Sequence, residues 1–342
     1  MKYRSLPVLC VAFFGPAALD FGQQPGPGSA PLGGRFAYIV GVRSHSSGDD
    51  SGYISVHGIS TKTGELMVAP GMTFAAGKSP SSLAIDPTGK FVYVADMDSN
   101  NVLGYRINGD TGALTPVEGS PFPAESEPNS ISIDSAGKFV YVTNLGSDNI
   151  SAYRIESATG RLTTLSGSPF RAGTAPQSLA FHPGGRFVYV TNSASDNVFV
   201  YTINPTTGAL AAVPGSPFPA GRTAHSASVD PTGKFVYVAS DGVWGFRIAP
   251  TGALTVVAGS PFGAGPETMS LSVDGTGKFV YVAMAGSHGS PGYRIDAATG
   301  ALKLLPGISF PQRQAEDAGS PMVDPSRNVL HITCLLYTSR CV

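Results

Sequence analysis

One tetrapeptide recurs along almost the whole chain, and its spacing constrains the fold more than any other feature. FVYV and its two variants begin at Phe36 (FAYI), Phe91, Phe139, Phe187, Phe235, Phe279 and Val329 (VLHI). The successive spacings are 55, 48, 48, 48, 44 and 50 residues. Seven copies at a nearly constant period predict one stacked repeat architecture and exclude two unrelated domains.

Each repeat contains four strand signals. In the unit that follows residue 81, we expect strands over 82–85, 91–95, 102–107 and 114–117. The turns between them carry Asp-Pro-Thr-Gly, Ser-Asn-Asn and Thr-Gly, which are typical turn residues, and a GSPF segment leads to the next unit. Four short antiparallel strands repeated radially are typical of a propeller blade. We therefore predict an all-β, seven-bladed β-propeller of four-stranded antiparallel blades over residues 33–333.

Alternation within FVYV places the aromatic residues on one face of the strand and the valines on the other. Both faces are apolar, as a blade between two neighbours requires. The third strand carries an aromatic column at Tyr105, Tyr153, Tyr201, Phe246 and Tyr293. His57 occupies this column in the first unit, and we interpret it as a core histidine with a local partner rather than as a ligand. Arginine recurs beside the column at Arg106, Arg154, Arg247 and Arg294, which we interpret as solvent-exposed edge positions.

The beginning of the chain has the composition of an export signal followed by a linker. Lys2 and Arg4 precede a mostly apolar stretch with small residues near its end, and this stretch is too short to span a bilayer. We therefore predict a signal peptide over residues 1–20, a Gly- and Pro-rich linker over 21–32, and a periplasmic or secreted location. An ordinary hydrophobic strand is the alternative for the apolar stretch.

The seventh repeat is incomplete. Its second strand is expected at 329–333, but a short tail, residues 334–342, stands where a third and a fourth strand should follow. We interpret this tail as non-native and the last blade as truncated. In the native protein, a C-terminal strand would close the ring by pairing with the Phe36 strand, because the first unit lacks an opening strand of its own.

Composition narrows the classes of partner. The chain has 342 residues and a net charge of −1 without a basic patch, so we expect no nucleic acid. Its cysteines are Cys10, Cys334 and Cys341, which leaves the repeats without a disulfide or a thiolate metal site. No HExxH, CxxC, GxSxG or phosphate-cradling loop occurs. We expect a monomer that has no membrane span and uses neither a cofactor nor a metal.

The repeats resemble those of the YVTN-type propellers and of the wider seven-bladed lactonase family, which includes bacterial 6-phosphogluconolactonase. The YVTN motif stands at 141–144 and again at 189–192, and the phrases DPTGKFVYV, TGALT and GSPF also recur. The resemblance covers about residues 33–333 and implies the same fold. It also implies that Arg, His and Glu side chains surround one mouth of the central channel.

Two motifs of that family have altered counterparts here. The family's GPRH motif has its nearest match at Gly221-Arg222-Thr223-Ala224-His225, where two residues separate the arginine from the histidine. The family's Asn-Glu pair after the following strand is replaced by Ser240-Asp241.

Aligning the loops that enter each repeat identifies candidate site positions independently. The residue before the first strand's serine is Ser81, Asn129, Gln177, His225, Met269 and Gly319 in successive units. Flanking positions add the charged residues Lys78, Glu125, Glu127, Arg222, Glu267, Glu316 and Asp317. Positions that vary on a fixed scaffold commonly face solvent and carry function. Radial symmetry would gather these residues around one end of the channel.

Lactone hydrolysis needs a base that activates water and a cation that stabilises the carbonyl oxyanion. We expect His225 as the base, Arg222 as an oxyanion or phosphate clamp, and Glu127 or Glu267 as the orienting acid. Ordinary solvated loop charges are the alternative. His182 replaces the aspartate of the usual turn, and we expect a turn role for it.

Two function hypotheses follow. The first is a lactonase-like hydrolase that opens a sugar lactone by metal-independent attack of water. The second is a non-enzymatic periplasmic or secreted scaffold that binds a small carbohydrate or an unknown protein partner. Near-identical repeats favour the scaffold, because an active site breaks symmetry, whereas the departure at Arg222 and His225 favours the enzyme.

Overall fold

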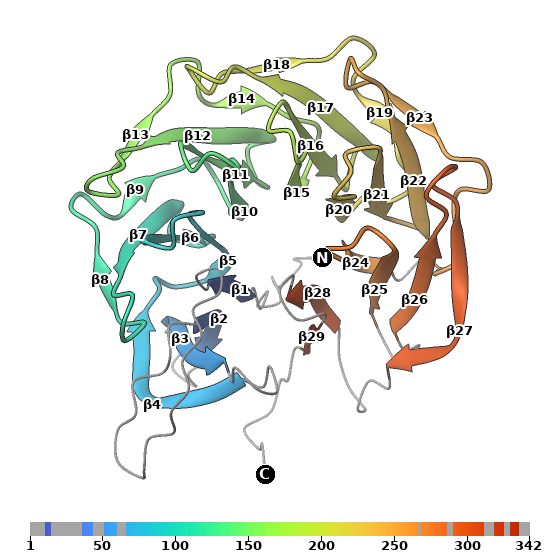
Figure 1. The fold of residues 1–342 in the computed structure, drawn as a ribbon. Coiled ribbons are helices and arrows are strands. Elements are labelled where there is room, and N and C mark those ends of the chain that lie inside the picture. The colour runs from blue at the N-terminus through green and yellow to red at the C-terminus, as the bar shows by residue number, and fades with distance from the viewer. Residues whose placement is uncertain are drawn as a thin grey trace, which may run out of the picture.

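The computed structural model describes residues 11–14, 36–43, 51–59, 66–265, 268–285, 290–310, 318–324 and 329–334. These residues form seven sheets arranged in a ring, with the first strand of each sheet nearest the centre (Figure 1). The strands of each sheet are antiparallel and follow one another in chain order. The predicted all-β, seven-bladed propeller is confirmed, and its last sheet has only two strands among the described residues.

Blades 2, 3 and 4 each contain four strands and a short fifth one. Blade 2 consists of β5 (Pro80–Ile85), β6 (Phe91–Asp96), β7 (Asn101–Ile107), β8 (Leu114–Pro116) and β9 (Phe122–Pro123). Blade 3 consists of β10 (Pro128–Ile133), β11 (Phe139–Asn144), β12 (Asn149–Ile155), β13 (Leu162–Thr164) and β14 (Phe170–Arg171). Blade 4 consists of β15 (Pro176–Phe181), β16 (Phe187–Asn192), β17 (Asn197–Ile203), β18 (Leu210–Ala212) and β19 (Phe218–Pro219).

In the described residues of the other blades, no separate fifth strand is present. Blade 1 consists of β1 (Val11–Phe14), β2 (Phe36–Arg43), β3 (Ser51–Ile59) and β4 (Leu66–Ala75). Blade 5 consists of β20 (Ser226–Val229), β21 (Phe235–Ala239), β22 (Val243–Ile248) and β23 (Leu254–Val256). Blade 6 consists of β24 (Thr268–Val273), β25 (Phe279–Met284), β26 (Ser290–Ile295) and β27 (Leu302–Phe310). Blade 7 consists of β28 (Ala318–Asp324) and β29 (Val329–Cys334).

The short fifth strand was expected to be a connecting segment. In blade 2, Phe122 and Pro123 pair with Val102 and Asn101 at the start of β7. β7 has seven residues and β8 only three, so β8 cannot pair with the first half of β7. The GSPF segment pairs there instead, because backbone groups of a buried strand need partners.

β1 lies within the segment predicted to be a signal peptide, residues 1–20. It pairs antiparallel with β2, with Val11 opposite Ile39 and Phe14 opposite Phe36. The first blade therefore has an opening strand, contrary to the expectation that a C-terminal strand alone could pair there. The signal peptide itself stays a prediction, and the predicted linker (21–32) and residues 335–342 lie outside the described residues.

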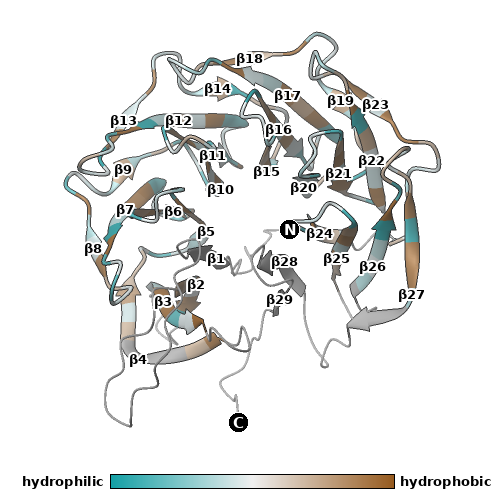
Figure 2. Ribbon diagram, viewed as in Figure 1, coloured by the Kyte–Doolittle hydropathy of each residue, from teal (hydrophilic) through white to brown (hydrophobic). Residues whose placement is uncertain are grey.

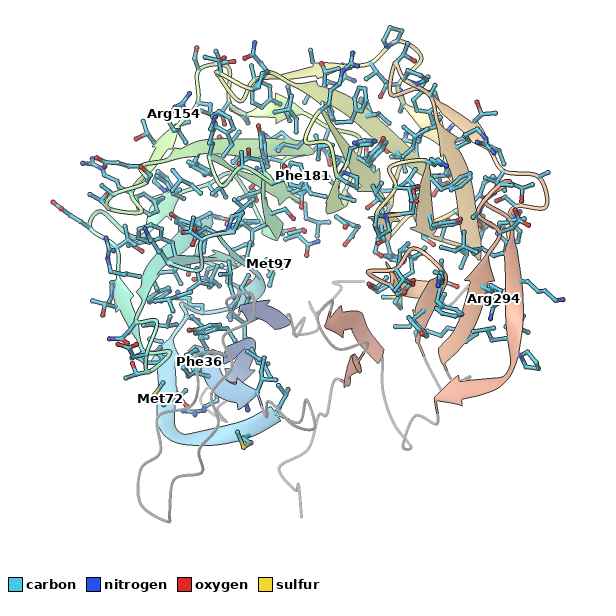
Figure 3. All side chains as sticks on the ribbon, viewed as in Figure 1. Phe36, Met72, Met97, Arg154, Phe181 and Arg294 are labelled. Atoms are coloured by element: carbon cyan, nitrogen blue, oxygen red, sulfur yellow. The ribbon has the colours of Figure 1, made fainter. Side chains whose placement is uncertain are left out.

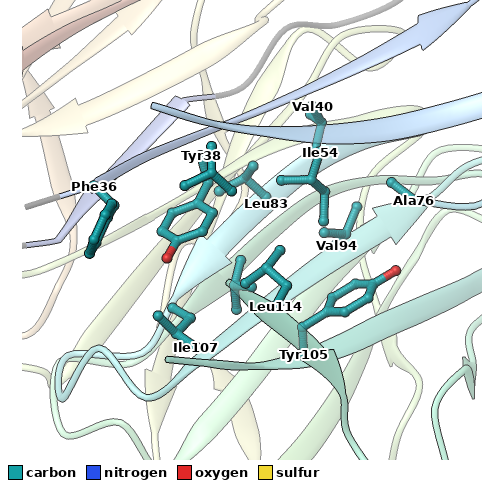
Figure 4. Packing of buried hydrophobic residues seen from close by; sticks show 12 residues of the cluster. Phe36, Tyr38, Val40, Ile54, Ala76, Leu83, Val94, Tyr105, Ile107 and Leu114 are labelled. Atoms are coloured by element: carbon teal, nitrogen blue, oxygen red, sulfur yellow. The ribbon is translucent and has the colours of Figure 1, made fainter. Parts of the chain in front are cut away.

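The hydrophobic core lies between the blades. One cluster joins Phe36 and Tyr38 of blade 1 to Val92, Val94 and Tyr105 of blade 2 (Figure 4). Four similar clusters join each later pair of blades as far as blade 6. In each, the aromatic residues of FVYV face the following blade and the valines face the preceding one, which confirms the alternation read from the sequence. Figure 2 shows the resulting apolar strands with polar residues at many of the turns.

Three contacts recur from one blade to the next. A Cβ on Gly160, which has a φ of 81°, would lie 2.3 Å from the Phe91 ring of the preceding blade, so this turn position requires glycine. The Tyr93 hydroxyl donates to the Gly160 carbonyl (2.7 Å). Arg106 lies over the Phe91 ring, 4.8 Å from its centroid, and donates to the Ala158 carbonyl (2.8 Å).

A fourth contact runs back to the preceding blade. The third-strand tyrosine donates to a carbonyl of the neighbouring outer edge, as Tyr153 does to Pro123 (2.6 Å). In blade 1, His57 stands in this column, and its Nε2 lies 3.0 Å from Ser55 Oγ, which confirms a local partner. The arginine column is exposed, as expected, and Figure 3 shows Arg154 towards the outside of the ring. Arg106, Arg154 and Arg247 also donate to carbonyl groups of the next blade, which the sequence did not indicate.

The interface between blades 4 and 5 lacks most of these contacts. The buried Tyr189 hydroxyl has no hydrogen-bond partner in the described part of the chain. The turn that should present its acceptor, 249–252, is one residue shorter than the corresponding turn 204–208. Phe246 and Thr202 stand where blades 2, 3 and 6 have the third-strand tyrosine and the arginine. Arg186 replaces the missing arginine only in part, by donating to the Pro250 carbonyl at 3.3 Å.

The turn between the first two strands is held by an aspartate. Asp86 accepts the backbone N–H groups of Thr88 (3.0 Å) and Phe91 (2.6 Å). His182 takes this place in blade 4, where its Nδ1 accepts the Gly184 N–H (2.9 Å). The expected turn role of His182 is therefore confirmed.

Candidate functional site

The loops that enter the blades meet the turns between second and third strands at one end of the ring. In blade 2, for example, the N–H groups of Lys78 and Ser79 donate to the buried Asp96 carboxylate at 3.1 and 2.8 Å. We call this end the loop face. It consists of residues 77–79, 97–100, 125–127, 145–148, 173–175, 193–196, 221–223 and 240–242.

In the loops that enter blades 3, 4 and 5, one equivalent residue has a left-handed backbone. Glu127, Ala175 and Thr223 have φ values of 55°, 54° and 56°. The N–H of each is bound by a turn side chain of the blade that the loop leaves, at 2.9 Å by Asn100, 2.8 Å by Asp148 and 2.8 Å by Asp196, respectively. Because the contact uses only the backbone N–H, the side chain at this position is free to vary between repeats.

The residues before the first strand's serine form a hydrogen-bonded series around the centre of the ring. Ser81 Oγ donates to the Pro128 carbonyl of the next blade (2.8 Å). Asn129 Nδ2 contacts the carbonyl and Oε1 of Gln177 (3.0 and 3.1 Å). Gln177 Nε2 in turn donates to Ser193 Oγ (3.1 Å). These three side chains hold the scaffold together.

His225 continues this series through its backbone only. Its N–H donates to the Ala239 carbonyl (2.9 Å), and its carbonyl accepts the Thr191 hydroxyl (3.0 Å). The imidazole makes no hydrogen bond to the described residues. Burial lowers the pKa of His225 below its usual value of 6.5. The half-buried ring is therefore neutral at pH 7 and can accept a proton.

Arg222 precedes His225 on a firmly held backbone. Ser240 Oγ donates to the Arg222 carbonyl (2.5 Å), and Thr223 is bound by Asp196 of blade 4. The Arg222 side chain is exposed and has no partner among the described residues. Where blades 4 and 5 meet, the structure thus places a cation at the loop face and a neutral base three residues further along the chain.

Glu127 lies at the loop face of blade 3. Its carboxyl carbon is 3.2 Å from the place that a Cβ on Gly146 would take, so the side chain lies over its own blade's turn. No described contact joins Glu127 to His225 or Arg222, and its role as the orienting acid stays a prediction. Glu267, Glu316 and Asp317 lie outside the described residues.

Three residues that are not among the predicted site residues support the loop that carries Arg222. Trp244 Nε1 donates to Asp241 Oδ1 (2.9 Å), and Ser240 binds the Arg222 carbonyl. A Cβ on Gly221 would lie 2.2 Å from Trp244 Nε1 and 2.3 Å from Asp241 Oδ1. A signal was present in the sequence, because blade 5 has the one tryptophan and its segment from Phe235 to Phe246 is three residues shorter than the segment from Phe187 to Tyr201 in blade 4.

Among the residues that the structure describes, no three His, Cys, Asp or Glu side chains gather in a way that could hold a metal ion. In the same residues, no helix has the length and apolar character needed to cross a membrane.

The fold and the loop face define a seven-bladed propeller with a basic, histidine-containing position at one blade interface. The family described as "Lactonase, 7-bladed beta-propeller" matches residues 33–127 and 122–313. The chain therefore belongs to the lactonase family of seven-bladed β-propellers. Comparison with curated proteins gives no match.

Solved structures share the fold at low sequence identity. A candidate 6-phosphogluconolactonase from Bacteroides uniformis is 21% identical, with a TM-score of 0.69 over 81% of this chain and 82% of that one. The periplasmic gluconolactonase of Pseudomonas aeruginosa is 19% identical, with a TM-score of 0.70 over 88% and 86%. Hydrazine synthase from Kuenenia stuttgartiensis is 15% identical, with a TM-score of 0.62 over 89% and 93%. Such different proteins share the fold, so activity must be argued from the site.

Proposed function

We propose that the protein hydrolyses a sugar lactone at the interface between blades 4 and 5. His225 takes a proton from water as the water oxygen attacks the lactone carbonyl carbon. Arg222 stabilises the negative charge that develops on the carbonyl oxygen. The ring C–O bond then breaks, and the His225 imidazolium returns its proton to the leaving alkoxide. The product is an open-chain hydroxy acid.

One observation carries this proposal. The side chains of Ser81, Asn129 and Gln177 form hydrogen bonds within the scaffold. The imidazole of His225 forms no such bond in the described structure. Its lowered pKa keeps the base form available at neutral pH. Membership of the lactonase family and likeness to a gluconolactonase support the substrate class.

The test is the rate of opening of δ-gluconolactone and of its 6-phosphate, measured against spontaneous opening. His225→Ala should lower kcat/KM by roughly 10²- to 10⁴-fold, and Arg222→Ala should lower it by roughly 10²- to 10³-fold. Gln177→Ala is the matched control from the same series, and it should retain the rate. Comparing the two substrates also tests whether Arg222 prefers a phosphorylated lactone.

The second candidate is a non-enzymatic periplasmic or secreted binding scaffold. It is favoured by the absence of any carboxylate bonded to the His225 imidazole among the described residues. A chain that unfolds cooperatively but opens neither lactone faster than water does would leave this alternative as the better interpretation.

A further inference from the structure

We propose that Arg222 binds the carboxylate of the open-chain hydroxy acid, and that Ser240, Asp241 and Trp244 are positioning residues that hold Arg222 for this contact. The choice of ligand rests on the proposed function, because opening a sugar lactone converts its carbonyl carbon into a carboxylate. The binding itself does not require turnover.

The first step of the argument is how tightly blade 5 holds the backbone next to Arg222. Gly221 has a φ of 75° and leaves no room for a Cβ, because Trp244 Nε1 and Asp241 Oδ1 would lie within 2.3 Å of it. The indole N–H is fixed by its hydrogen bond to Asp241. Ser240 Oγ then binds the next carbonyl, that of Arg222, at 2.5 Å. Three side chains of blade 5 therefore hold the backbone at Gly221 and Arg222.

The second step is the contact from the neighbouring blade. The N–H of Thr223 donates to Asp196 Oδ1 of blade 4 (2.8 Å), with Thr223 in the left-handed region. The peptide group that follows Arg222 is thus held from two blades, with its carbonyl bound by Ser240 of blade 5 and its N–H bound by Asp196 of blade 4. A fixed backbone reduces the entropy lost when a long side chain is ordered on a ligand.

The third step concerns charge. The nearby carboxylate of Asp241 already accepts the Trp244 N–H, and Arg222 forms no ion pair with the described residues. The guanidinium is exposed and keeps its donors available. A planar guanidinium binds a carboxylate through two parallel hydrogen bonds, which makes a carboxylate its best-matched small ligand.

The described loops that enter blades 2, 3 and 4 lack this combination. The positions equivalent to Arg222 are Lys78, Ser126 and Thr174 in blades 2, 3 and 4. Blade 4 binds its loop one residue later, since Ser193 Oγ donates to the Ala175 carbonyl (3.2 Å), and it presents no cation at Thr174. Ser193 therefore supplies a control serine on a loop of the same chain.

Binding can be followed by the intrinsic fluorescence of Trp244, because it is the one tryptophan of the chain and packs against Gly221. We expect D-gluconate to change its fluorescence in a saturable way. Arg222→Ala should abolish the change, and Ser240→Ala should raise the Kd roughly five- to tenfold. Ser240→Thr keeps the hydroxyl and should restore most of the affinity. Ser193→Ala should leave the Kd unchanged. Trp244→Phe, followed by calorimetry, should weaken binding like Ser240→Ala.

The outcomes separate this inference from the proposed function. Saturable, Arg222-dependent binding of gluconate without hydrolysis would support the carboxylate site and contradict the proposed lactonase activity. Hydrolysis that depends on Arg222 without any binding of gluconate would support the lactonase activity and contradict the carboxylate site. Equal effects of Ser240→Ala and Ser193→Ala on Kd would overturn the positioning role, since a general loss of stability would then explain both.

Discussion

Tyr141 and Tyr189 occupy the same position in adjacent blades, but their hydroxyls differ in what they meet. Tyr141 donates to the Gly208 carbonyl at 2.7 Å, whereas the Tyr189 hydroxyl is buried without a described partner. Tyr141→Phe should therefore lower the free energy of unfolding by about 1 kcal/mol, and Tyr189→Phe should leave it unchanged or raise it. Urea unfolding of the two variants measures the difference. Equal losses would mean that water or another group satisfies Tyr189.

His225 couples the site to pH. Burial lowers its folded-state pKa below 6.5, so between that pKa and 6.5 the unfolded chain binds more protons than the folded one. Its stabilising contribution is complete above pH 6.5 and is lost as the pH falls through this window. His225→Gln should therefore lose less stability than the parent chain between about pH 7 and pH 5.

The same lowered pKa sets the activity profile of the proposed enzyme. The acid limb of kcat/KM should fall below pH 6.5, because only protonation of a more acidic imidazole removes the base. A limb well above that pH would assign the base to another group. The measurement is the pH–rate profile for δ-gluconolactone, corrected at each pH for spontaneous opening.

At the scale of strands and turns, the interface between blades 4 and 5 is held mainly by packing. Phe246 lies opposite Val236, in the register that Tyr105 holds opposite Val92, yet it has no hydroxyl to offer the Pro219 carbonyl. Phe246→Tyr should restore that contact and raise the free energy of unfolding by about 0.5 to 1.5 kcal/mol. Its counterpart is Tyr201→Phe at the interface of blades 3 and 4, which should lower stability by a similar amount.

Chemical denaturation of both variants provides the comparison. A gain from Phe246→Tyr together with a loss from Tyr201→Phe would show that each tyrosine contributes as a donor between blades. If Phe246→Tyr lowers stability, the added oxygen has met no acceptor at this interface.

At the scale of the whole ring, the first blade depends on the first residues of the chain, because β1 pairs with β2. Removal of residues 1–20, as cleavage of a signal peptide would cause, deprives β2 of the neighbour it has along Phe36–Ile39. The shortened chain should melt at a lower temperature, by at least about 2 °C for each kcal/mol lost. Calorimetry on both lengths tests this. Equal melting temperatures would show that another segment pairs with β2.

The sequence predicted the elements that recur in every blade, and it missed the elements that depend on contacts with other strands. FVYV with its alternating faces and the aspartate turn of Asp86 are local patterns, so the strands and the blade number followed from them. The strand formed by Phe122 and Pro123 was missed because it depends on the length difference between β7 and β8. The pairing of β1 was missed because its partner is more than twenty residues away.

The candidate site was predicted only in part, because some of its contacts also depend on residues that are distant in the sequence. His225 and Arg222 break the repeat and can be found by aligning the loops. The support from Trp244 depends on the space around Gly221, which no one-dimensional pattern contains. Glu127 was selected by its charge alone, although its backbone N–H rather than its carboxylate is what the blade interface uses.

The contacts between blades also bear on how such a ring can lengthen over evolution. Tyr93 is the donor and Gly160 the acceptor of one bond, and they belong to successive blades. A duplicated blade brings a donor for its successor and an acceptor for its predecessor, so tandem duplication inserts a unit that already fits on both sides. Blade 5 has a short turn and Phe246, so every copy of it would lack the same hydrogen bonds to the preceding blade. We therefore expect gene duplication to have copied its neighbours rather than blade 5.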